Sequence, residues 1–435
     1  MKQLTYNLIF ILTFIGFSQA QERIPLRKAE VLDKVLKSNY SLQISEAQFD
    51  ASKADFKQTN AVFLPNITAS HTGVSTTNPL MAFGSKLNQG ILTAADFNPA
   101  LLNDPEPTQN FATKFEIQQP LINVDGFYQR KAAKNKMEAT ALQTERTKDY
   151  LELEVEQAYM QLQLAYKGVA VLEQALLTAE ANERLAKNSF NQGYLQKSDV
   201  LAVSVRVTEV KNQLQMARSN VVNASNYLSF LMNENQEAIY QPTDSLQVVI
   251  PQNNLLLQVS EDRADIKAMS LATNTYETMY KADKMTFLPR LNAFGSYELY
   301  DDQIFQGNAN GYIVGAQLSW DILQGTKRFG KAQKSRSEFE QSKLKYQQYV
   351  SQSQLELNKA KRLLQDAQNK LELTTLALEQ SKESLRIRKN RFEEGLEKTT
   401  DLLLADTQYA QKQLEYYQTI YEYNYALAYV QFLTK

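Results

Sequence analysis

The sequence has no cysteine and a single histidine, His71, among its 435 residues. The absence of cysteine excludes disulfides, thiolate zinc sites, thiol nucleophiles and a lipid-bearing N-terminal cysteine. One histidine excludes a multi-histidine metal site, and a Ser-His-Asp arrangement would have to use His71. No partner motif accompanies it, so we expect no enzyme, no bound metal and no cofactor. We expect His71 to line the polar face of a strand or to stand at a strand end.

Glycine is also scarce, with 14 in the chain, and no Gly-rich phosphate loop is present. Neither sign of charge dominates, since 47 Lys and Arg residues balance 48 Asp and Glu residues. A near-neutral chain argues against a nucleic-acid-binding surface, which is normally basic. The low glycine content, with abundant Gln, Leu, Ala, Glu and Lys, favours long helices.

The first twenty residues contain the longest apolar run. They place Lys2 ahead of an apolar stretch at 8–17 and end with Ser18 and Ala20. This layout is typical of a secretory signal peptide cleaved after Ala20, and the stretch is too short for a membrane-spanning anchor. No later run approaches eighteen apolar residues. If the mature chain enters a membrane, it must therefore do so as strands.

An internal repeat organises the rest of the chain. Residues 155–201 align with residues 357–403 without a gap, and their apolar positions are spaced alternately three and four apart. This spacing is typical of a helix packed in a coiled-coil seam, so these side chains hold helices together and perform no chemistry. Residues 127–191 contain no proline and one glycine. They predict a helix of about 100 Å.

Each repeat contains the same short turn. The segments KNSFNQGYLQKSD and KNRFEEGLEKTTD share a spaced pattern. Their glycines, Gly193 and Gly395, stand where a helix C-terminus often requires a positive φ. Returning helices are expected at 199–232 and from 401 to the C-terminus, so both turns are predicted to be the tips of helical hairpins.

Ser198 and Thr400 are the expected N-caps of the returning helices, because Ser and Thr are favoured at that position. Each is followed by an aspartate, Asp199 or Asp401, which suits the positive end of the helix dipole. Capping alone does not explain why a Lys-Asn pair also recurs before each glycine. We therefore expect the two tips to share a role.

Two shorter helices are expected at 26–62 and 263–285, and each is followed by Phe-Leu-Pro, at 63–65 and 287–289. After each tripeptide the apolar period changes from helical to two, which predicts strands. The expected strands are 66–75 and 111–118 in the first half and 290–300 and 312–321 in the second, with loops at 76–110 and 301–310.

These strands have the length and the aromatic ends of transmembrane barrel strands. A half-buried sheet in a soluble protein would alternate in the same way, but the signal peptide favours the membrane. Four strands do not close a barrel, and an open sheet edge is not tolerated in lipid. We therefore expect a mainly α chain, internally duplicated. Three copies would share one membrane β-barrel of twelve strands and one long-helix α-barrel of twelve helical columns.

With these features in this order, the chain resembles the TolC-type outer-membrane efflux family. The resemblance is carried by the duplicated Phe-Leu-Pro, the turns QPLINVDG and SWDILQG, the segment Arg263-Ala264-Asp265 and the two tips. It covers residues 21–435. The expected organisation is a signal peptide at 1–20, a first repeat at 21–240, a linker at 241–262 and a second repeat at 263–435.

The resemblance implies a homotrimeric duct in the outer membrane of a Gram-negative bacterium, surrounded by outer-membrane lipid and extending into the periplasm. Such a duct passively conducts substrates delivered by an inner-membrane pump of the RND, ABC or MFS type, and it binds no nucleic acid. A periplasmic adaptor (membrane fusion) protein would dock at the tips. The matching tip residues are Gly193, Tyr194, Leu195, Gly395 and Leu396.

The resemblance also implies an aspartate ring that narrows the closed periplasmic entrance. Asp401 matches one such aspartate. The position three residues later is Leu404, and the next acid is Asp406, so the ring is only partly carried over. The loops at 76–110 and 301–310 would face the cell exterior, where outer-membrane barrels keep their longer loops.

The alternative function is the outer-membrane duct of a type I protein secretion system, which shares this architecture. A neighbouring gene for an inner-membrane pump and adaptor would favour efflux. An ABC transporter with a secreted substrate would favour protein export. A periplasmic adaptor or a structural coiled-coil protein is a further class, but an adaptor carries one hairpin beside β-rich domains. This chain has two hairpins and two separated strand pairs.

Overall fold

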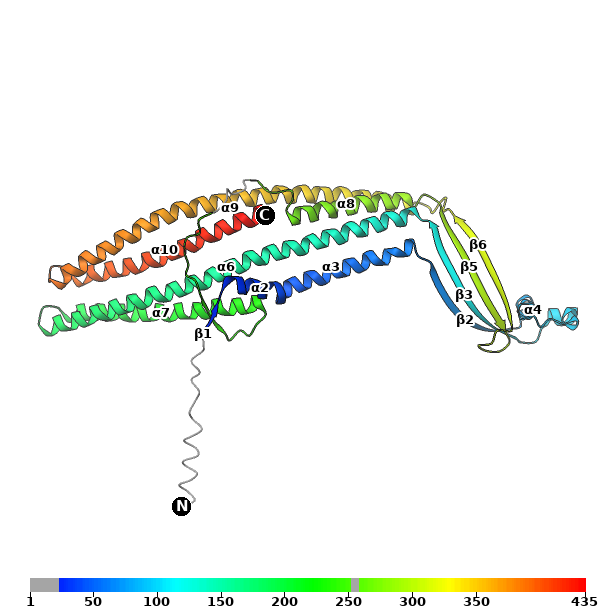
Figure 1. Cartoon of the computed structure of the whole chain (residues 1–435), viewed down its shortest axis with the longest axis horizontal. Coiled ribbons are helices and arrows are strands. Elements are labelled where there is room, and N and C mark those ends of the chain that lie inside the picture. The colour runs from blue at the N-terminus through cyan, green and yellow to red at the C-terminus, as the bar shows by residue number, and fades with distance from the viewer. Residues whose placement is uncertain (1–22, 252–257) are drawn as a thin grey trace, which may run out of the picture. The chain divides into compact units, whose positions relative to one another are not determined.

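The computed structural model describes residues 23–251 and 258–435 (Figure 1). The predicted signal peptide at 1–20 lies outside these ranges. The contacts divide the chain into two compact units. The hairpin unit comprises residues up to 46, 144–264 and 350–435, and the sheet unit comprises 47–143 and 265–349. Across the described ranges, every helix is too short or too polar to cross a membrane.

The hairpin unit contains two long helical hairpins. In the first, α6 (Val124–Asn191) is followed by α7 (Lys197–Met232). In the second, α9 (Lys327–Glu393) is followed by α10 (Thr399–Thr434). The long helices α6 and α9 also contribute residues to the sheet unit. The predicted long helix at 127–191 and both returning helices are confirmed.

Apolar seams hold each hairpin together, as the three-four spacing predicts. On α6, Val155 and Leu162 are almost fully buried, in a cluster that includes Leu228 of α7. On α9, Leu357 is fully buried and packs with Val430 of α10. Burying a Leu or Val side chain stabilises the fold by about 1.5–3 kcal/mol, so the repeated stripe is the core of this unit.

Arg263, which opens the Arg-Ala-Asp segment, secures the end of the last helix. Its guanidinium is buried and donates to the carbonyl of Leu433 at 3.0 Å and to the hydroxyl of Ser353 at 2.7 Å. It thereby satisfies a carbonyl that a helix C-terminus leaves without an intrahelical partner. The following helix, α8 (Ala264–Met285), agrees with the predicted one at 263–285.

The N-terminal part of the chain departs from the prediction of one helix at 26–62. It forms a strand, β1 (Arg23–Leu26), paired in parallel with β4 (Ile239–Pro242). The helix is then broken at Asn39, whose side chain donates to the Leu231 carbonyl and accepts from the Ser41 backbone N–H. The backbone of Asn39 is extended, and its side chain caps the first turn of the next helix while its nitrogen is held by the Leu231 carbonyl. The resulting elements are α2 (Lys28–Ser38), α3 (Tyr40–Gln58) and the 3-10 turn η2 (Thr59–Val62).

The sheet unit is built around four antiparallel strands in the order β2-β3-β5-β6 (Figure 1). They are β2 (Asn66–Thr76), β3 (Thr108–Ile122), β5 (Arg290–Asp301) and β6 (Ala309–Ser319), which confirms all four predicted strands. Because alternate side chains point to opposite faces, the register makes one face apolar and the other polar. The apolar face carries Ile67, Phe115, Ile117, Leu291, Tyr297, Val314 and Leu318, and the polar face carries Ser70, Lys114, Glu116, Asn292, Ser296, Glu298 and Gln317.

The two Phe-Leu-Pro segments form matching junctions between helix and strand. The Phe63 ring lies 5.1 Å from the Phe127 ring, and the backbone carbonyl of Phe63 accepts a hydrogen bond from the Gln119 side chain. The Phe287 ring lies 5.4 Å from that of Phe329, and its carbonyl accepts from Trp320. An arginine also stacks on each phenylalanine. Proline then ends helical geometry for the residue before it, so both strands start at the same point of the motif.

The long connection between β2 and β3, expected as a loop, contains three short helices. They are α4 (Pro79–Asn88), the 3-10 turn η3 (Ala94–Phe97) and α5 (Pro99–Asn103). Pro79 and Pro99 occupy the first helical positions of α4 and α5, where a missing N–H costs nothing. Asn78 and Asn98 accept hydrogen bonds from the first turns of α4 and α5 and act as their N-caps.

Candidate functional site

The two hairpin tips are the candidate functional site, and their backbones have the same geometry. Gly193 has a φ of +83° and Gly395 a φ of +72°. In the first tip, the N–H of Tyr194 bonds to the carbonyl of Ser189 at 2.9 Å; in the second, the N–H of Leu396 bonds to that of Arg391 at 2.8 Å. These bonds close the helix end in the manner of a Schellman motif. The predicted positive φ of both glycines is confirmed.

The predicted N-caps are wrong by two residues. The capping positions are Gln196 and Lys398, which have extended backbones, and Ser198 and Thr400 already lie inside the first helical turn. The backbone is extended at Gln196 and Lys398, three residues after each glycine, and each helix begins at the next residue. In the first tip, the Asp199 carboxylate accepts from the Gln196 backbone N–H at 3.0 Å and so completes the cap.

Apolar side chains project from both tips. Tyr194 is 79% exposed and Leu396 is 67% exposed, whereas Leu195 is half-buried. A single exposed apolar residue needs no explanation. Tyr194 and Leu396, however, each directly follow the glycine of a tip, so they form a matching pair of contact points. The structure brings all five predicted tip residues to the ends of the hairpins, at the same end of the hairpin unit (Figure 1).

Only the second tip, among the residues that the structure describes there, carries a compact charge cluster. The Glu397 carboxylate lies 2.7 Å from Arg388 and 2.8 Å from Arg391. Arg391 also donates to the Leu396 carbonyl at 3.3 Å, so the turn is fastened to the end of α9. The corresponding residues of the first tip are Ala186, Ser189 and Leu195, which have no charge. The two tips therefore share a backbone but differ in electrostatics.

Asp401, the predicted constriction residue, lies in the first turn of α10 and is half-buried. Its carboxylate is 4.0 Å from Arg388, the same arginine that binds Glu397. An arginine this close offsets part of the negative charge that Asp401 presents. Leu404, three residues later, is 55% exposed and adds no charge to this surface.

Asp406, the next acidic residue after Asp401, lies inside the hairpin unit and not on its surface. Its side chain is 4% exposed and lies 3.5 Å from the guanidinium of Arg206, which is 7% exposed. Burial raises the pKa of the Asp406 carboxyl, and the charge of Arg206 offsets part of that rise. Asp406 therefore joins α10 to α7. Sequence spacing holds a signal for a buried charge at Arg206, which interrupts the buried seam of Val203, Val207 and Val210, but it does not identify Asp406 as the partner.

His71 lies in the middle of β2, on the apolar face, and not at a strand end or on the polar face as predicted. Its Nδ1 is 2.9 Å from the Thr113 hydroxyl, and its ring stacks on Phe305 at 4.5 Å. Phe305 has a positive φ of 60°, so the connection between β5 and β6 bends back to reach it. Aromatic neighbours on an apolar face give His71 a packing role.

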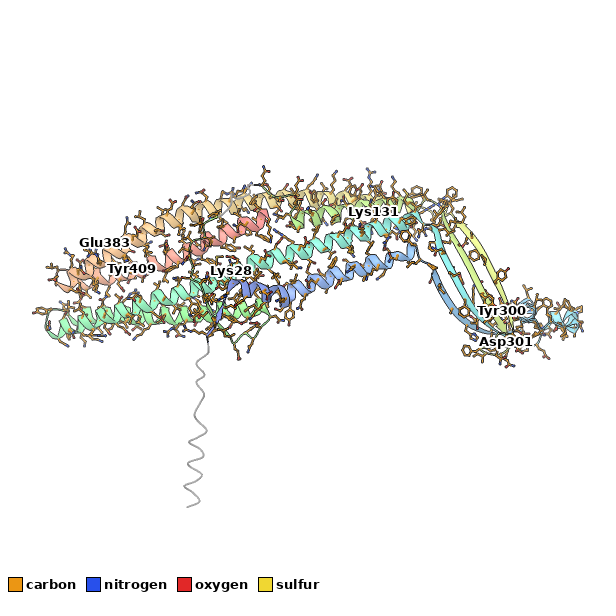
Figure 2. The ribbon with its side chains drawn as sticks, in the orientation of Figure 1. Lys28, Lys131, Tyr300, Asp301, Glu383 and Tyr409 are labelled. Carbon is orange, nitrogen blue, oxygen red and sulfur yellow. The ribbon has the colours of Figure 1, made fainter. Side chains whose placement is uncertain are left out.

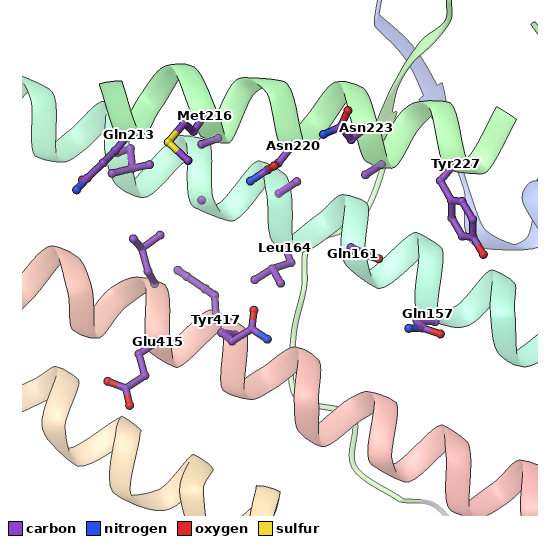
Figure 3. A pocket seen from close by; sticks show the side chains of 17 residues that line it. Gln157, Gln161, Leu164, Gln213, Met216, Asn220, Asn223, Tyr227, Glu415 and Tyr417 are labelled. Atoms are coloured by element: carbon purple, nitrogen blue, oxygen red, sulfur yellow. The ribbon is translucent and has the colours of Figure 1, made fainter. Parts of the chain in front are cut away.

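A groove of about 1030 Å³ runs between α6, α7 and α10 of the hairpin unit (Figure 3). Amide side chains dominate its polar lining, among them Gln157, Gln161, Asn220 and Asn223, and Glu415 supplies a single carboxylate. Sequence reasoning did not identify this groove, because its residues come from three separated segments. Apolar side chains and two tyrosines, Tyr227 and Tyr417, make up most of the rest of its described lining.

The fold is that of outer membrane channels. The Campylobacter jejuni CmeC outer membrane channel aligns with a TM-score of 0.80 at 16% identity, over 94% of this chain and 85% of that one. The Vibrio cholerae outer membrane protein VceC gives 0.79 at 14% identity, over 94% and 96%. The open state of the Neisseria gonorrhoeae MtrE outer membrane channel gives 0.73 at 16% identity, over 92% and 89%. These identities are low, and the likeness is one of fold.

The chain belongs to the outer membrane efflux protein family, which matches residues 31–234 and 255–434. The resemblance inferred from the duplicated motifs is thereby confirmed, as is the placement in the outer membrane. Members of this family are channel proteins. No protein with a curated description matches the chain.

Proposed function

We propose that this chain is the exit duct of a tripartite efflux system, extending from the outer membrane into the periplasm. It would passively conduct substrates delivered by an inner-membrane pump and a periplasmic adaptor. The observation that carries the proposal is the presence, in one efflux-family chain, of two hairpins with matching tips and a sheet with one apolar and one polar face.

Three copies would complete the duct. The sheet has two unpaired edge strands, β2 and β6, and such edges are not tolerated in lipid. Twelve strands from three copies would close a barrel with the apolar face toward lipid and the polar face toward the passage. Exposed apolar residues on α7 and α9 support side-by-side packing of copies, because they have no cover in a single chain: Leu201, Val205 and Met216 on α7, and Leu363 and Leu373 on α9.

The tips would dock the adaptor. The proposed contact residues are Gly193, Tyr194, Leu195, Gly395 and Leu396. A groove of about 730 Å³ adjoins the second tip, lined by Leu376, Ile387, Arg388, Arg391 and Glu397 among others. Exposed apolar side chains beside a groove with paired charges would suit the end of a helical hairpin. Asp401 would face the periplasmic constriction, with its charge partly offset by Arg388.

The two halves of the chain would be repeats of one unit, at 21–240 and 263–435, joined by a linker at 241–262. The matching tips, Phe-Leu-Pro junctions and strand pairs support this division. A signal peptide at 1–20 would direct export. Mass spectrometry of the mature protein should therefore place its N-terminus at Gln21, and a retained N-terminal segment would contradict the export step.

The alternative, a duct for type I protein secretion, shares every feature above and differs in the pump that delivers the substrate. A deletion strain tests between them. Loss of the gene should raise sensitivity to antibiotics, dyes or metals if the duct serves efflux, and should retain a secreted protein in the cell if it serves protein export. Membrane fractionation is the accompanying control, since a soluble periplasmic monomer would overturn both.

A further inference from the structure

The connection between β2 and β3, residues 77–107 and here called the insertion, is a folded unit. The Phe83 and Phe97 rings meet edge to face at 5.7 Å, and Lys86 binds Asp96 at 2.9 Å. The backbone N–H of Thr93, followed by Lys86, lowers the pKa of Asp96 to about 2. These contacts join α4 to η3, so the insertion has a definite shape.

Gln89 anchors the insertion to the end of the sheet. Its buried side-chain nitrogen donates to the carbonyl of Gln109 at 2.8 Å, to the side chain of Asn110 at 2.9 Å and to the carbonyl of Asp301 at 3.2 Å. Figure 2 labels Asp301 at this end of β5. One buried amide thus ties α4 to both β3 and β5, which fixes the direction in which the insertion projects.

The insertion presents two unlike surfaces, an apolar ridge and a hollow whose lining is partly charged, with Lys86, Asp96 and Glu106. One is a ridge on α4, where Leu80 is 81% exposed and Leu87 is 58% exposed, with open space over Gly84 between them. These three positions are spaced four and three apart, so they share a helix face. The other surface is a hollow of about 270 Å³ between α4 and α5. Its lining includes Phe83, Leu101, Leu102 and Pro105.

Size brings neighbouring insertions close together in the proposed trimer. A compact unit of about 30 residues has a radius of gyration of about 8 Å, hence a width of about 21 Å. A barrel of twelve strands, about 4.8 Å apart and tilted by about 40°, has a diameter of about 24 Å. Three units centred on its rim would lie about 21 Å apart. That spacing equals their own width, so neighbouring insertions would touch.

We propose that the ridge of one copy packs into the hollow of the next, so that three insertions form a ring over the external mouth of the barrel. The proposal rests on the proposed trimeric duct. A three-fold ring requires head-to-tail contact between two different surfaces of each copy, and the ridge and the hollow provide such a pair. The ion pair of Lys86 and Asp96 at the hollow is satisfied within its own copy, so the contact would leave neither of these charges unpaired.

Cysteine cross-linking tests this contact directly, because the native chain has no cysteine. The double variant Leu80→Cys/Leu101→Cys should give dimers and covalent trimers when intact cells are treated with a short bis-maleimide. Each single variant should stay monomeric on a denaturing gel, because equivalent positions on three-fold-related copies are held apart. Adding Leu87→Asp to the double variant should abolish the cross-linked species, since a carboxylate would be buried in the contact.

The matched control is Ala95→Cys/Asp104→Cys, two exposed positions of the insertion outside the ridge. It should give no cross-linked trimer. Cross-linking by Leu80→Cys alone would overturn the head-to-tail contact, because ridges would then meet each other. Protection of Leu80→Cys from a membrane-impermeant maleimide without cross-linking would place the ridge in lipid or against another molecule, and would also overturn it.

Light scattering of the purified protein in detergent distinguishes failure of the ring from failure of the trimeric duct. A trimer in which the double variant does not cross-link would refute the ring and leave the duct intact. A monomer would contradict the duct itself.

Discussion

Arg206 on α7 and Asp406 on α10 form a buried ion pair that joins the first hairpin to the second. The guanidinium Nε lies 3.5 Å from the carboxylate Oδ2, and both side chains are less than one-tenth exposed. Neither of these two atoms has a hydrogen-bond partner among the described residues, so the attraction between them is mainly electrostatic. The pair therefore connects α7 with α10 inside the hairpin unit.

Arg206→Met should destabilise the protein by roughly 3–5 kcal/mol, because the Asp406 carboxylate would stay buried without its partner. The double variant Arg206→Met/Asp406→Leu should recover most of that loss, since it removes both charges. Thermal unfolding of the purified protein measures the cycle. A double variant destabilised by the sum of the losses in Arg206→Met and Asp406→Leu would mean that the two side chains are not coupled.

The pH dependence of stability provides a second readout of Asp406. Its pKa is raised in the folded state, so its contribution is fully present below the ordinary aspartate pKa and is lost as pH rises through the folded value. Asp406→Asn should lack this loss, and Arg206→Met should shift it to higher pH. Melting temperatures recorded across a pH series test this, and parallel curves for all three proteins would contradict it.

Gly193→Val combined with Gly395→Val should abolish transport while the trimer still assembles. Both glycines have a positive φ, which a β-branched residue adopts only at a cost of roughly 1–2 kcal/mol each. This cost is small beside the packing of the long helices, so the damage should stay at the tips. A substrate-export assay with adaptor cross-linking is the measurement. Normal export and cross-linking would reduce the tips to simple connections.

Arg388→Gln and Asp401→Ala should have opposite effects on block by multivalent cations. Removing Arg388 exposes the charge of Asp401 and should strengthen block, whereas removing Asp401 should weaken it and change the resting conductance. Single-channel recording in a planar bilayer, with cations on the periplasmic side, is the test. Glu383→Gln is the control, because Glu383 is an exposed carboxylate of α9 that pairs with Arg386. Identical traces for all variants would leave Asp401 as an ordinary first-turn residue.

The polar face of the sheet should make the passage prefer cations. Lys114 lies 3.0 Å from Glu116 and 3.5 Å from Glu298, so each copy carries two carboxylates for one ammonium. Glu298→Gln should lower the preference and Lys114→Gln should raise it, as measured by reversal potential in a salt gradient. Tyr297→Phe, on the apolar face, should leave it unchanged. A shift in that control would mean that the faces are reversed.

Local pattern was enough to predict the long helices, the four strands and the backbone of the tips. The reason is that each depends on neighbours in sequence: a three-four apolar spacing, strict alternation, or a glycine at a helix end. We predicted Ser198 and Thr400 as N-caps because Ser and Thr are favoured at that position. The geometry of the turn instead puts Gln196 and Lys398 there, although their residue types are not favoured at N-caps.

Contacts between distant segments were beyond prediction. Arg206 and Asp406 lie in different hairpins, and the sequence around each residue does not indicate which residue it pairs with. The β1 strand pairs with β4 across the whole first hairpin, and the break at Asn39 depends on a carbonyl of α7. In the insertion, expected as a loop, Asn78 and Asn98 cap two helices that begin at Pro79 and Pro99, and the contacts around them decide that these helices form.

The pairing of β1 with β4 has a consequence for the order in which the protein matures. Arg23 is bonded in register with Ile239, so its partner is translated only after all of α6 and α7. Until then β1 has no strand with which to pair. We expect the signal peptidase to act within this interval. The strand β1 would thus be among the last elements of the first half of the chain to form its hydrogen bonds.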